Sequence, residues 1–149
     1  MLPPAMAETP SRIVIDTQVV MDWLVFGDAR VRPLVAAIEA GQVLWIGRAA
    51  MLEELRHVLG RGVAADRKPD LALIEHAFAA HCRMIEAEPA PAVRLVCRDP
   101  DDQQFIDLAL AEQAAWLISR DKAVLALAKR ALTFGFRILT PEAWIKLQG

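Results

Sequence analysis

The chain has 149 residues, of which 55% are hydrophobic and 24% are charged, and its formal net charge is -2 at pH 7. These values suit one globular domain with a substantial buried core, and they exclude a disordered polar chain. No apolar stretch reaches the ~18 residues that a membrane span needs, so we expect no membrane partner.

The N-terminal residues MLPPAMAETPS carry prolines and small side chains, without a charged segment that leads into an apolar run. This pattern differs from that of a secretion signal. We therefore expect residues 1–11 to form a flexible tail, and residues 12–149 to form one domain in the cytoplasm. Two cysteines, Cys82 and Cys97, are too few for a disulfide framework or a zinc site, which agrees with a reducing compartment.

Buried strands and helices alternate along the chain. The first half predicts a strand at 12–17, helices over 19–26 and 30–40, a strand at 43–47, and helices over 49–59 and 70–86. The second half predicts an extended segment at 88–94, a helix over 101–115, a strand at 116–119, a helix over 122–132, a strand at 136–140 and a last helix. Residues 61–69 are the expected flexible loop.

This alternation predicts the α/β class, as a three-layer α/β/α domain whose central parallel sheet of four or five strands is flanked by helices. Ligands of open α/β sheets bind beyond the C-terminal ends of the strands. Asp16 lies at the end of the first predicted strand, and Asp121 follows the strand at 116–119. Both acids are therefore expected at the same functional edge.

Helical geometry selects two further acids. At about 100° per residue, Glu53 points away from the apolar stripe of its helix, whereas Glu54 lies at the border of that stripe. By the same measure Asp102 lies within about 30° of the apolar face of its helix, and Asp107 points away. Capping would explain one acid at that helix start, but the motif RDPDD supplies more acids than one cap requires.

Carboxylates that converge on one edge repel one another and raise each other's pKa values. A hard divalent cation such as Mg²⁺ removes this conflict, and it needs few protein ligands because it keeps several waters. Such an ion activates water and stabilises charge on a phosphate group. The acids therefore predict a metal site for phosphoryl chemistry.

Five motifs, read in chain order, resemble the PIN-domain family: IDTQVV, LEELRHVL, CRDPDDQQFIDLALA, LISRDKAVLAL and FRILTPEAWI. Together they extend from about residue 12 to residue 147. The likeness is greatest to the bacterial branch of toxin components of type II toxin–antitoxin systems. It implies a Mg²⁺- or Mn²⁺-dependent endoribonuclease that cleaves single-stranded RNA, a cognate antitoxin protein and a homodimer.

The resemblance implies that four acids are both catalytic residues and metal ligands: Asp16, Glu54, Asp102 and Asp121. It also gives supporting roles to Gln18, Asp99 and Ser119, of which Ser119 replaces the usual threonine. Gln18 stands in place of the usual asparagine, and Ala123 in place of a further acid. These two departures favour an alternative, a catalytically weak or inactive PIN-like module that binds RNA or protein.

Basic residues flank the predicted acidic edge, and RNA phosphates require such contacts. The predicted RNA-binding residues are Arg48, Arg56, Arg120 and Lys122. Asp22, one helical turn after Gln18, is expected on a solvated face instead.

Two other α/β classes fit the sequence less well. A receiver-like signalling domain needs a phosphorylatable aspartate at the end of a central strand, and the strand at 43–47 ends without an acid. A phosphatase of the haloacid dehalogenase kind needs D-x-D after the first strand, where this chain has Asp16-Thr17-Gln18.

Overall fold

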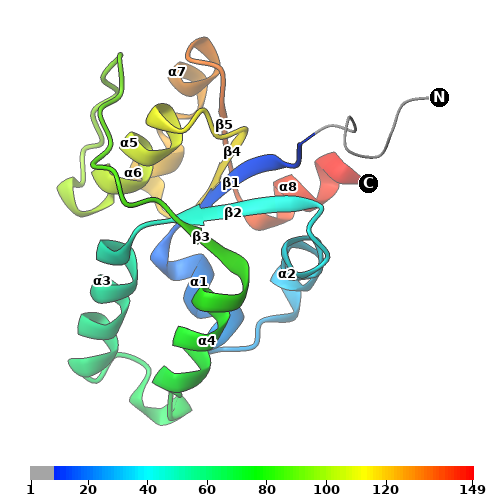
Figure 1. Cartoon of the computed structure of the whole chain (residues 1–149), viewed down its shortest axis with the longest axis vertical. Coiled ribbons are helices and arrows are strands. Elements are labelled where there is room, and N and C mark those ends of the chain that lie inside the picture. The colour runs from blue at the N-terminus through cyan, green and yellow to red at the C-terminus, as the bar shows by residue number, and fades with distance from the viewer. Residues whose placement is uncertain (1–8) are drawn as a thin grey trace.

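A sheet of five parallel strands lies at the centre of the protein, in a computed structural model that describes residues 9–149 (Figure 1). The strands are β1 (Ser11–Ile15), β2 (Val43–Gly47), β3 (Cys82–Met84), β4 (Trp116–Ile118) and β5 (Arg137–Leu139). They lie in the order β3-β2-β1-β4-β5, so β1 is central. β2 and β3 lie on one side of β1, and the chain then crosses to the other side, where β4 and β5 lie. The predicted α/β class with a parallel sheet is confirmed.

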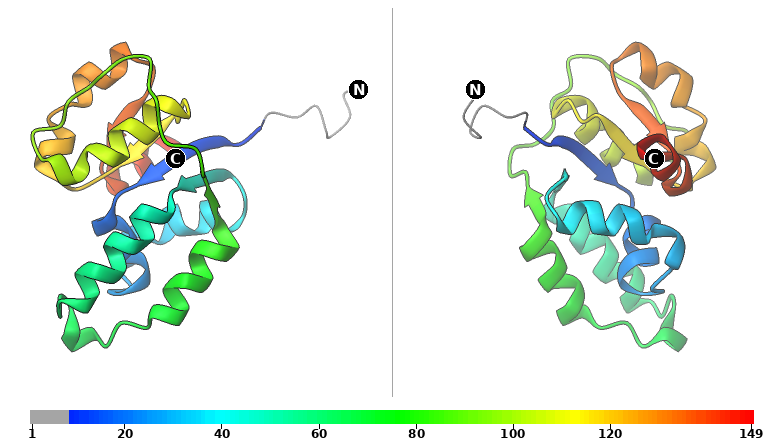
Figure 2. Two further views of the ribbon diagram at one scale, coloured as in Figure 1. Left: turned by 60° about the vertical axis from the view of Figure 1, so that its left-hand side comes forward. Right: turned by 90° about the vertical axis from the view of Figure 1, so that its right-hand side faces the viewer.

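Helices cover both faces of the sheet. One face carries α1 (Thr17–Leu24), the 3-10 helix η2 (Ala29–Val31), α2 (Arg32–Glu39), α3 (Ala49–Gly60), α4 (Leu71–His81) and α8 (Pro141–Gln148). The other face carries α5 (Gln103–Ala111), α6 (Lys122–Leu125) and α7 (Ala128–Thr133), with the 3-10 helix η4 (Pro100–Asp102) just before α5. Figure 2 shows α3 and α4 side by side, and the 3-10 helix η3 (Ala65–Arg67) lies in the connection between them.

The central strand has two buried faces, as its continuous apolar sequence predicts. Ile13 and Ile15 belong to the core under α1, α2, α3, α4 and α8, whereas Val14 belongs to the core under α5, α6 and α7. In the first core, the ring of Trp45 lies 4.7 Å from that of Phe78. Packing on both sides fixes the positions at which the strands end, and therefore the edge from which acidic side chains project.

The predicted helix over 70–86 is wrong at its C-terminal end. Helix α4 stops at His81, and Cys82–Met84 form strand β3 against β2. Gly47 permits this close pairing, because a Cβ atom there would lie 2.9 Å from the Cys82 sulfur. The predicted helix over 122–132 is likewise two helices, α6 and α7.

The predicted N-terminal tail lies mostly outside the described residues, and β1 begins at Ser11. Within residues 9–149, no helix is both long and apolar enough to cross a membrane.

Candidate metal centre

Acidic side chains from four segments meet beyond the C-terminal ends of the strands. They line a depression of about 290 Å³. The acids in this lining are Asp16, Glu54, Asp99, Asp101, Asp102 and Asp121. The described part of the lining contains no lysine, arginine or histidine, so its negative charge is not neutralised from within. The structure thus brings together all four acids that the sequence predicted.

Asp16 is held rigidly where β1 passes into α1. Its side chain caps α1, because Oδ1 accepts a hydrogen bond from the Val19 amide at 3.0 Å. The Ser119 hydroxyl donates to Oδ2 at 2.5 Å. Only 3% of Asp16 is exposed, and this burial raises the pKa of its carboxyl to about 6.

Asp121 is fixed in the same way at the start of α6. Its Oδ1 accepts a hydrogen bond from the Ala123 amide at 2.8 Å, and its own amide donates to the Ser119 hydroxyl at 2.9 Å. Ser119 is fully buried. Its hydroxyl oxygen connects Asp16 to Asp121, because it donates to the Asp16 carboxylate and accepts from the Asp121 amide. These contacts place Ser119 between two of the predicted acids.

Asp102 has the least compensated carboxylate of the group. Its Oδ2 is buried and has no hydrogen-bond partner among the described residues. Desolvation, followed by the charges of Asp121 and Asp99, raises its pKa to about 7. A buried carboxylate oxygen without a donor is costly, and a cation is the partner that removes the cost.

The tightest group consists of Asp99, Asp102 and Asp121. One carboxylate oxygen from each lies within 4.8 Å of the other two. Oxygens bound to one Mg²⁺ at ~2.0–2.1 Å are separated by at most about 4.2 Å, so small side-chain rotations would complete a site. The donor set therefore fits a hard divalent cation. Asp99, to which the resemblance gave only a supporting role, belongs to this group.

Glu54 faces the cluster from α3. Its Oε2 accepts hydrogen bonds from Gln104 at 2.7 Å and from Thr17 at 3.3 Å. Burial raises its pKa above the ordinary value. Its neighbour Glu53 instead forms an exposed ion pair with Arg56. The helical angles thus distinguished the two glutamates correctly, but they did not identify the two residues that donate to Glu54.

Gln18 and Asp22 contact each other on α1. The Gln18 amide donates to Asp22 Oδ1 at 3.0 Å, and Gln18 also lines the acidic depression. Asp22 is only 5% exposed, so the expectation of a solvated face is wrong. Its second oxygen accepts a hydrogen bond from Arg120, as described below.

The four basic residues predicted to bind RNA lie in different environments. Arg48 donates to the carbonyls of Ile85 and Glu86, and so anchors the long segment between β3 and η4. Arg56 pairs with two glutamates, and Arg120 pairs with two other acids. Lys122 alone of the four is exposed with no ion pair within residues 9–149.

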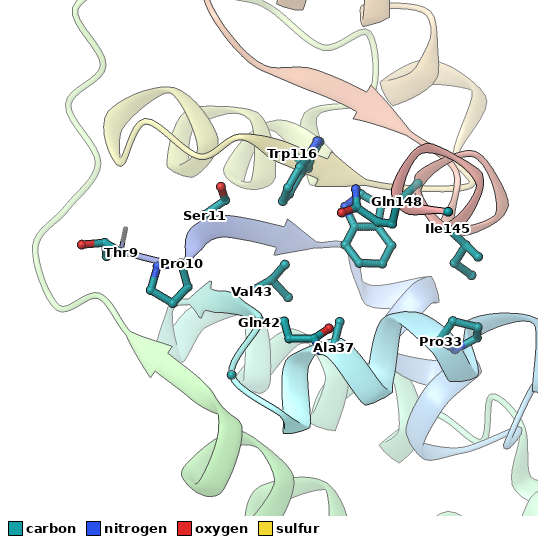
Figure 3. A pocket seen from close by; sticks show the side chains of 13 residues that line it. Thr9, Pro10, Ser11, Pro33, Ala37, Gln42, Val43, Trp116, Ile145 and Gln148 are labelled. Atoms are coloured by element: carbon teal, nitrogen blue, oxygen red, sulfur yellow. The ribbon is translucent and has the colours of Figure 1, made fainter. Parts of the chain in front are cut away.

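A larger depression lies elsewhere in the described structure. It has a volume of about 800 Å³ and lies beside the N-terminal ends of β1, β2 and β4, where α2 and α8 approach each other (Figure 3). None of the predicted acids lines it. Size therefore does not identify the chemical site in this fold, whereas the convergence of carboxylates does.

Comparison with known families agrees with this geometry. The family model described as PIN domain matches residues 12–123, which include all but the first residue of β1, the whole of β2, β3 and β4, and every acid of the cluster. A search of curated proteins found no match. PIN domains are generally nucleases that depend on divalent metal ions. Because the matched segment covers most of the chain and leads from the first acid to the last, the chain belongs to the PIN domain family.

Proposed function

We propose that the protein is a Mg²⁺- or Mn²⁺-dependent endoribonuclease that cleaves single-stranded RNA. The observation that carries this proposal is Asp102, whose Oδ2 is buried without a partner among the described residues and whose carboxylate has an oxygen within 4.8 Å of oxygens of Asp99 and Asp121. No cation of the described chain lines the depression around it. A divalent ion bound there would offset the repulsion among these carboxylates.

In this proposal Asp16, Glu54, Asp102 and Asp121 would hold the metal, and Asp99 is a further candidate ligand because its carboxylate belongs to the tightest group. When bound, a divalent ion supplies Lewis acidity that activates water and stabilises the charge of the phosphate. The hydrogen bonds at Asp16 and Asp121 fix these two carboxylates before metal arrives. Gln104 and Thr17 orient Glu54 toward the depression and leave its Oε1 free of hydrogen bonds from the described residues.

The RNA would approach past Lys122, which lies next to Asp121 and is exposed. Its ammonium group suits a phosphate contact, and the pairing of Arg56 and Arg120 with acids leaves Lys122 as the stronger candidate of the three. The resemblance to toxin components supports three further parts of the proposal: a cognate antitoxin, a homodimer and a cytoplasmic location.

The test is cleavage of a panel of single-stranded RNAs with Mn²⁺, Mg²⁺ or chelator. Asp16→Asn and Asp121→Asn should each abolish metal-dependent cleavage. Asp66→Asn is the matched control, because Asp66 is an exposed acid in η3, outside the cluster. Undiminished cleavage by Asp16→Asn would refute the assignment.

A second candidate is a catalytically weak or inactive module that binds RNA or protein. Two observations favour it: the Gln18 amide bonds to Asp22, and the buried Ala123 provides no further acid. Titration with Mn²⁺ separates the two candidates. A folded protein that neither binds Mn²⁺ nor cleaves any RNA would make the binding module the better account.

A further inference from the structure

A chain of four polar side chains runs beside the acidic cluster. Arg120 occupies its centre: Nε donates to Asp22 Oδ2 at 2.9 Å, while Nη1 and Nη2 each donate to a different oxygen of Glu142 at 2.6 Å. Gln18 extends the chain through its bond to the other oxygen of Asp22. We call these residues the Arg120 network.

This network joins three separate elements of the fold. Asp22 belongs to α1, Glu142 to the first turn of α8, and Arg120 to the connection between β4 and α6. The same connection is attached to β5, because the Ser119 amide donates to the Leu139 carbonyl at 3.0 Å. The guanidinium therefore fixes α1 and α8 relative to the loop that carries Asp121.

Carboxylates of the chain engage every nitrogen of Arg120, so only the second N–H of Nη1 and of Nη2 remains for a substrate phosphate. All three of its nitrogens donate to carboxylates, and its side chain is only 22% exposed. The carboxylate of Asp22 is 7% exposed, so removal of the guanidinium would leave a buried charge without its cation. The planar fork of arginine suits the paired contact with Glu142, which a lysine cannot reproduce.

The adjacent residues transmit this restraint to the cluster. Ser119, immediately before Arg120, donates to Asp16 and accepts from the Asp121 amide. Asp16 in turn begins α1, the helix that Arg120 holds through Asp22. Asp16 and Asp121 are thus linked twice: Ser119 joins the Asp16 carboxylate to the Asp121 amide, and Arg120 holds the helix that Asp16 begins.

From this double linkage we propose that Arg120 is a positioning residue, which holds α1 and the loop before α6 so that Asp16 and Asp121 keep their metal-binding geometry. The inference rests on the proposed metal-dependent function. Substitution of residues that orient metal ligands typically lowers metal affinity by about 10–100-fold. Small displacements suffice, because a productive site tolerates only about 0.5 Å of error.

The experiment measures Mn²⁺ affinity by electron paramagnetic resonance of the free ion, in Arg120→Met, Arg120→Lys and wild type. Arg120→Met should weaken Mn²⁺ binding by about 10–100-fold. Arg120→Lys, which keeps the charge and loses the fork, should fall between the other two. Arg12→Met is the matched control, since Arg12 also bonds to a glutamate but lies at the start of β1, away from the cluster.

Cleavage kinetics at saturating Mn²⁺ distinguish positioning from contact with RNA. Arg120→Met should lower kcat and leave KM for RNA unchanged. A raised KM with wild-type Mn²⁺ affinity would overturn the proposal and return Arg120 to the RNA-binding residues. If Arg120→Met does not fold, Glu142→Gln provides the test, because Arg120 then keeps its pairing with Asp22. The Glu142→Gln variant should bind Mn²⁺ several-fold more weakly than wild type.

The two hypotheses fail separately in this experiment. Wild-type protein that binds Mn²⁺, together with a folded Arg120→Met variant of equal affinity, would overturn the positioning role alone. Wild-type protein that binds no Mn²⁺ would overturn the proposed function, and the positioning role with it.

Discussion

Ionisation of the buried Asp16 carboxylate opposes folding, so Asp16→Asn should stabilise the metal-free protein at neutral pH. Burial is the largest cause that raises the pKa of Asp16 from 3.8 to about 6, although hydrogen bonds from Ser119 and Val19 lower it in part. The folded state therefore binds this proton more tightly than the unfolded chain. The free energy of unfolding should fall as pH rises from about 4 to about 6, and the loss should persist above that range.

The size of the effect follows from the same values. One pKa unit corresponds to about 1.36 kcal/mol, so the difference between 3.8 and about 6 corresponds to about 3 kcal/mol. Asparagine caps a helix as well as aspartate does. Its amide nitrogen cannot accept the proton of the Ser119 hydroxyl, which costs roughly 1 kcal/mol. We expect a net gain of about 1–2 kcal/mol at pH 8, or roughly 2–8 °C in Tm.

Urea unfolding in chelator at pH 4 and pH 8 measures this gain. At pH 8 the variant should be more stable than wild type, and at pH 4 the advantage should vanish, because Asp16 is then protonated in the folded wild type. Added Mn²⁺ should stabilise wild type and leave the variant nearly unchanged. A variant that is less stable at pH 8, or whose difference from wild type is equal at both pH values, would refute this account of the burial of Asp16.

Three further predictions concern the same site. Glu54→Gln should lower Mn²⁺ affinity at least tenfold in a titration, because its oxygen would lose its charge, whereas Glu53→Gln at the exposed ion pair should not; equal losses in both would contradict the assignment of Glu54. Mn²⁺ affinity should rise as pH increases through about 7, because Asp102 must lose the proton that its raised pKa retains; isothermal titration at pH 6 and pH 8 checks this, and equal affinities would count against Asp102 as a ligand. Lys122→Ala should weaken RNA binding uniformly across sequences and reduce the salt dependence by about one phosphate contact, while an unchanged salt slope would exclude Lys122 from the RNA interface.

Most of the fold could be predicted because the buried strands carry an unambiguous pattern. β1, β2, β4 and β5 are short apolar runs, and each lies within one or two residues of its predicted bounds. β3 was missed for a physical reason. Its three residues follow α4 without a glycine or proline that would end the helix, and their extended conformation depends on pairing with Trp45, Ile46 and Gly47 of β2.

The positions of the acids could be predicted from local structure, whereas their hydrogen-bond partners depend on contacts between distant segments. Strand ends and helix angles determine where a short carboxylate projects, and this placed Asp16 and Asp121 at one edge. Gln104 reaches Glu54 from a residue 50 positions away in the chain, and Arg120 reaches Asp22 across 98 positions. Contacts between long side chains depend on how helices pack against each other, which periodicity within one helix does not contain.

Arg120 also explains why the cluster retains its charge. An arginine directly beside Asp121 would be expected to neutralise so many acids, yet its guanidinium turns to Asp22 and Glu142 instead. Asp22 and Asp102 are therefore opposite cases: the chain supplies a cation for the first, whereas Asp102 keeps a buried oxygen without a partner among the described residues. If these acids served only to stabilise the fold, an Arg120 side chain turned toward the depression would neutralise more of them without any change in the sequence. The observed arrangement instead leaves the acidic depression without a cation in its described lining, which is the environment that the proposed divalent ion would fit, while Ser119 and Arg120 bond to residues on both sides of it.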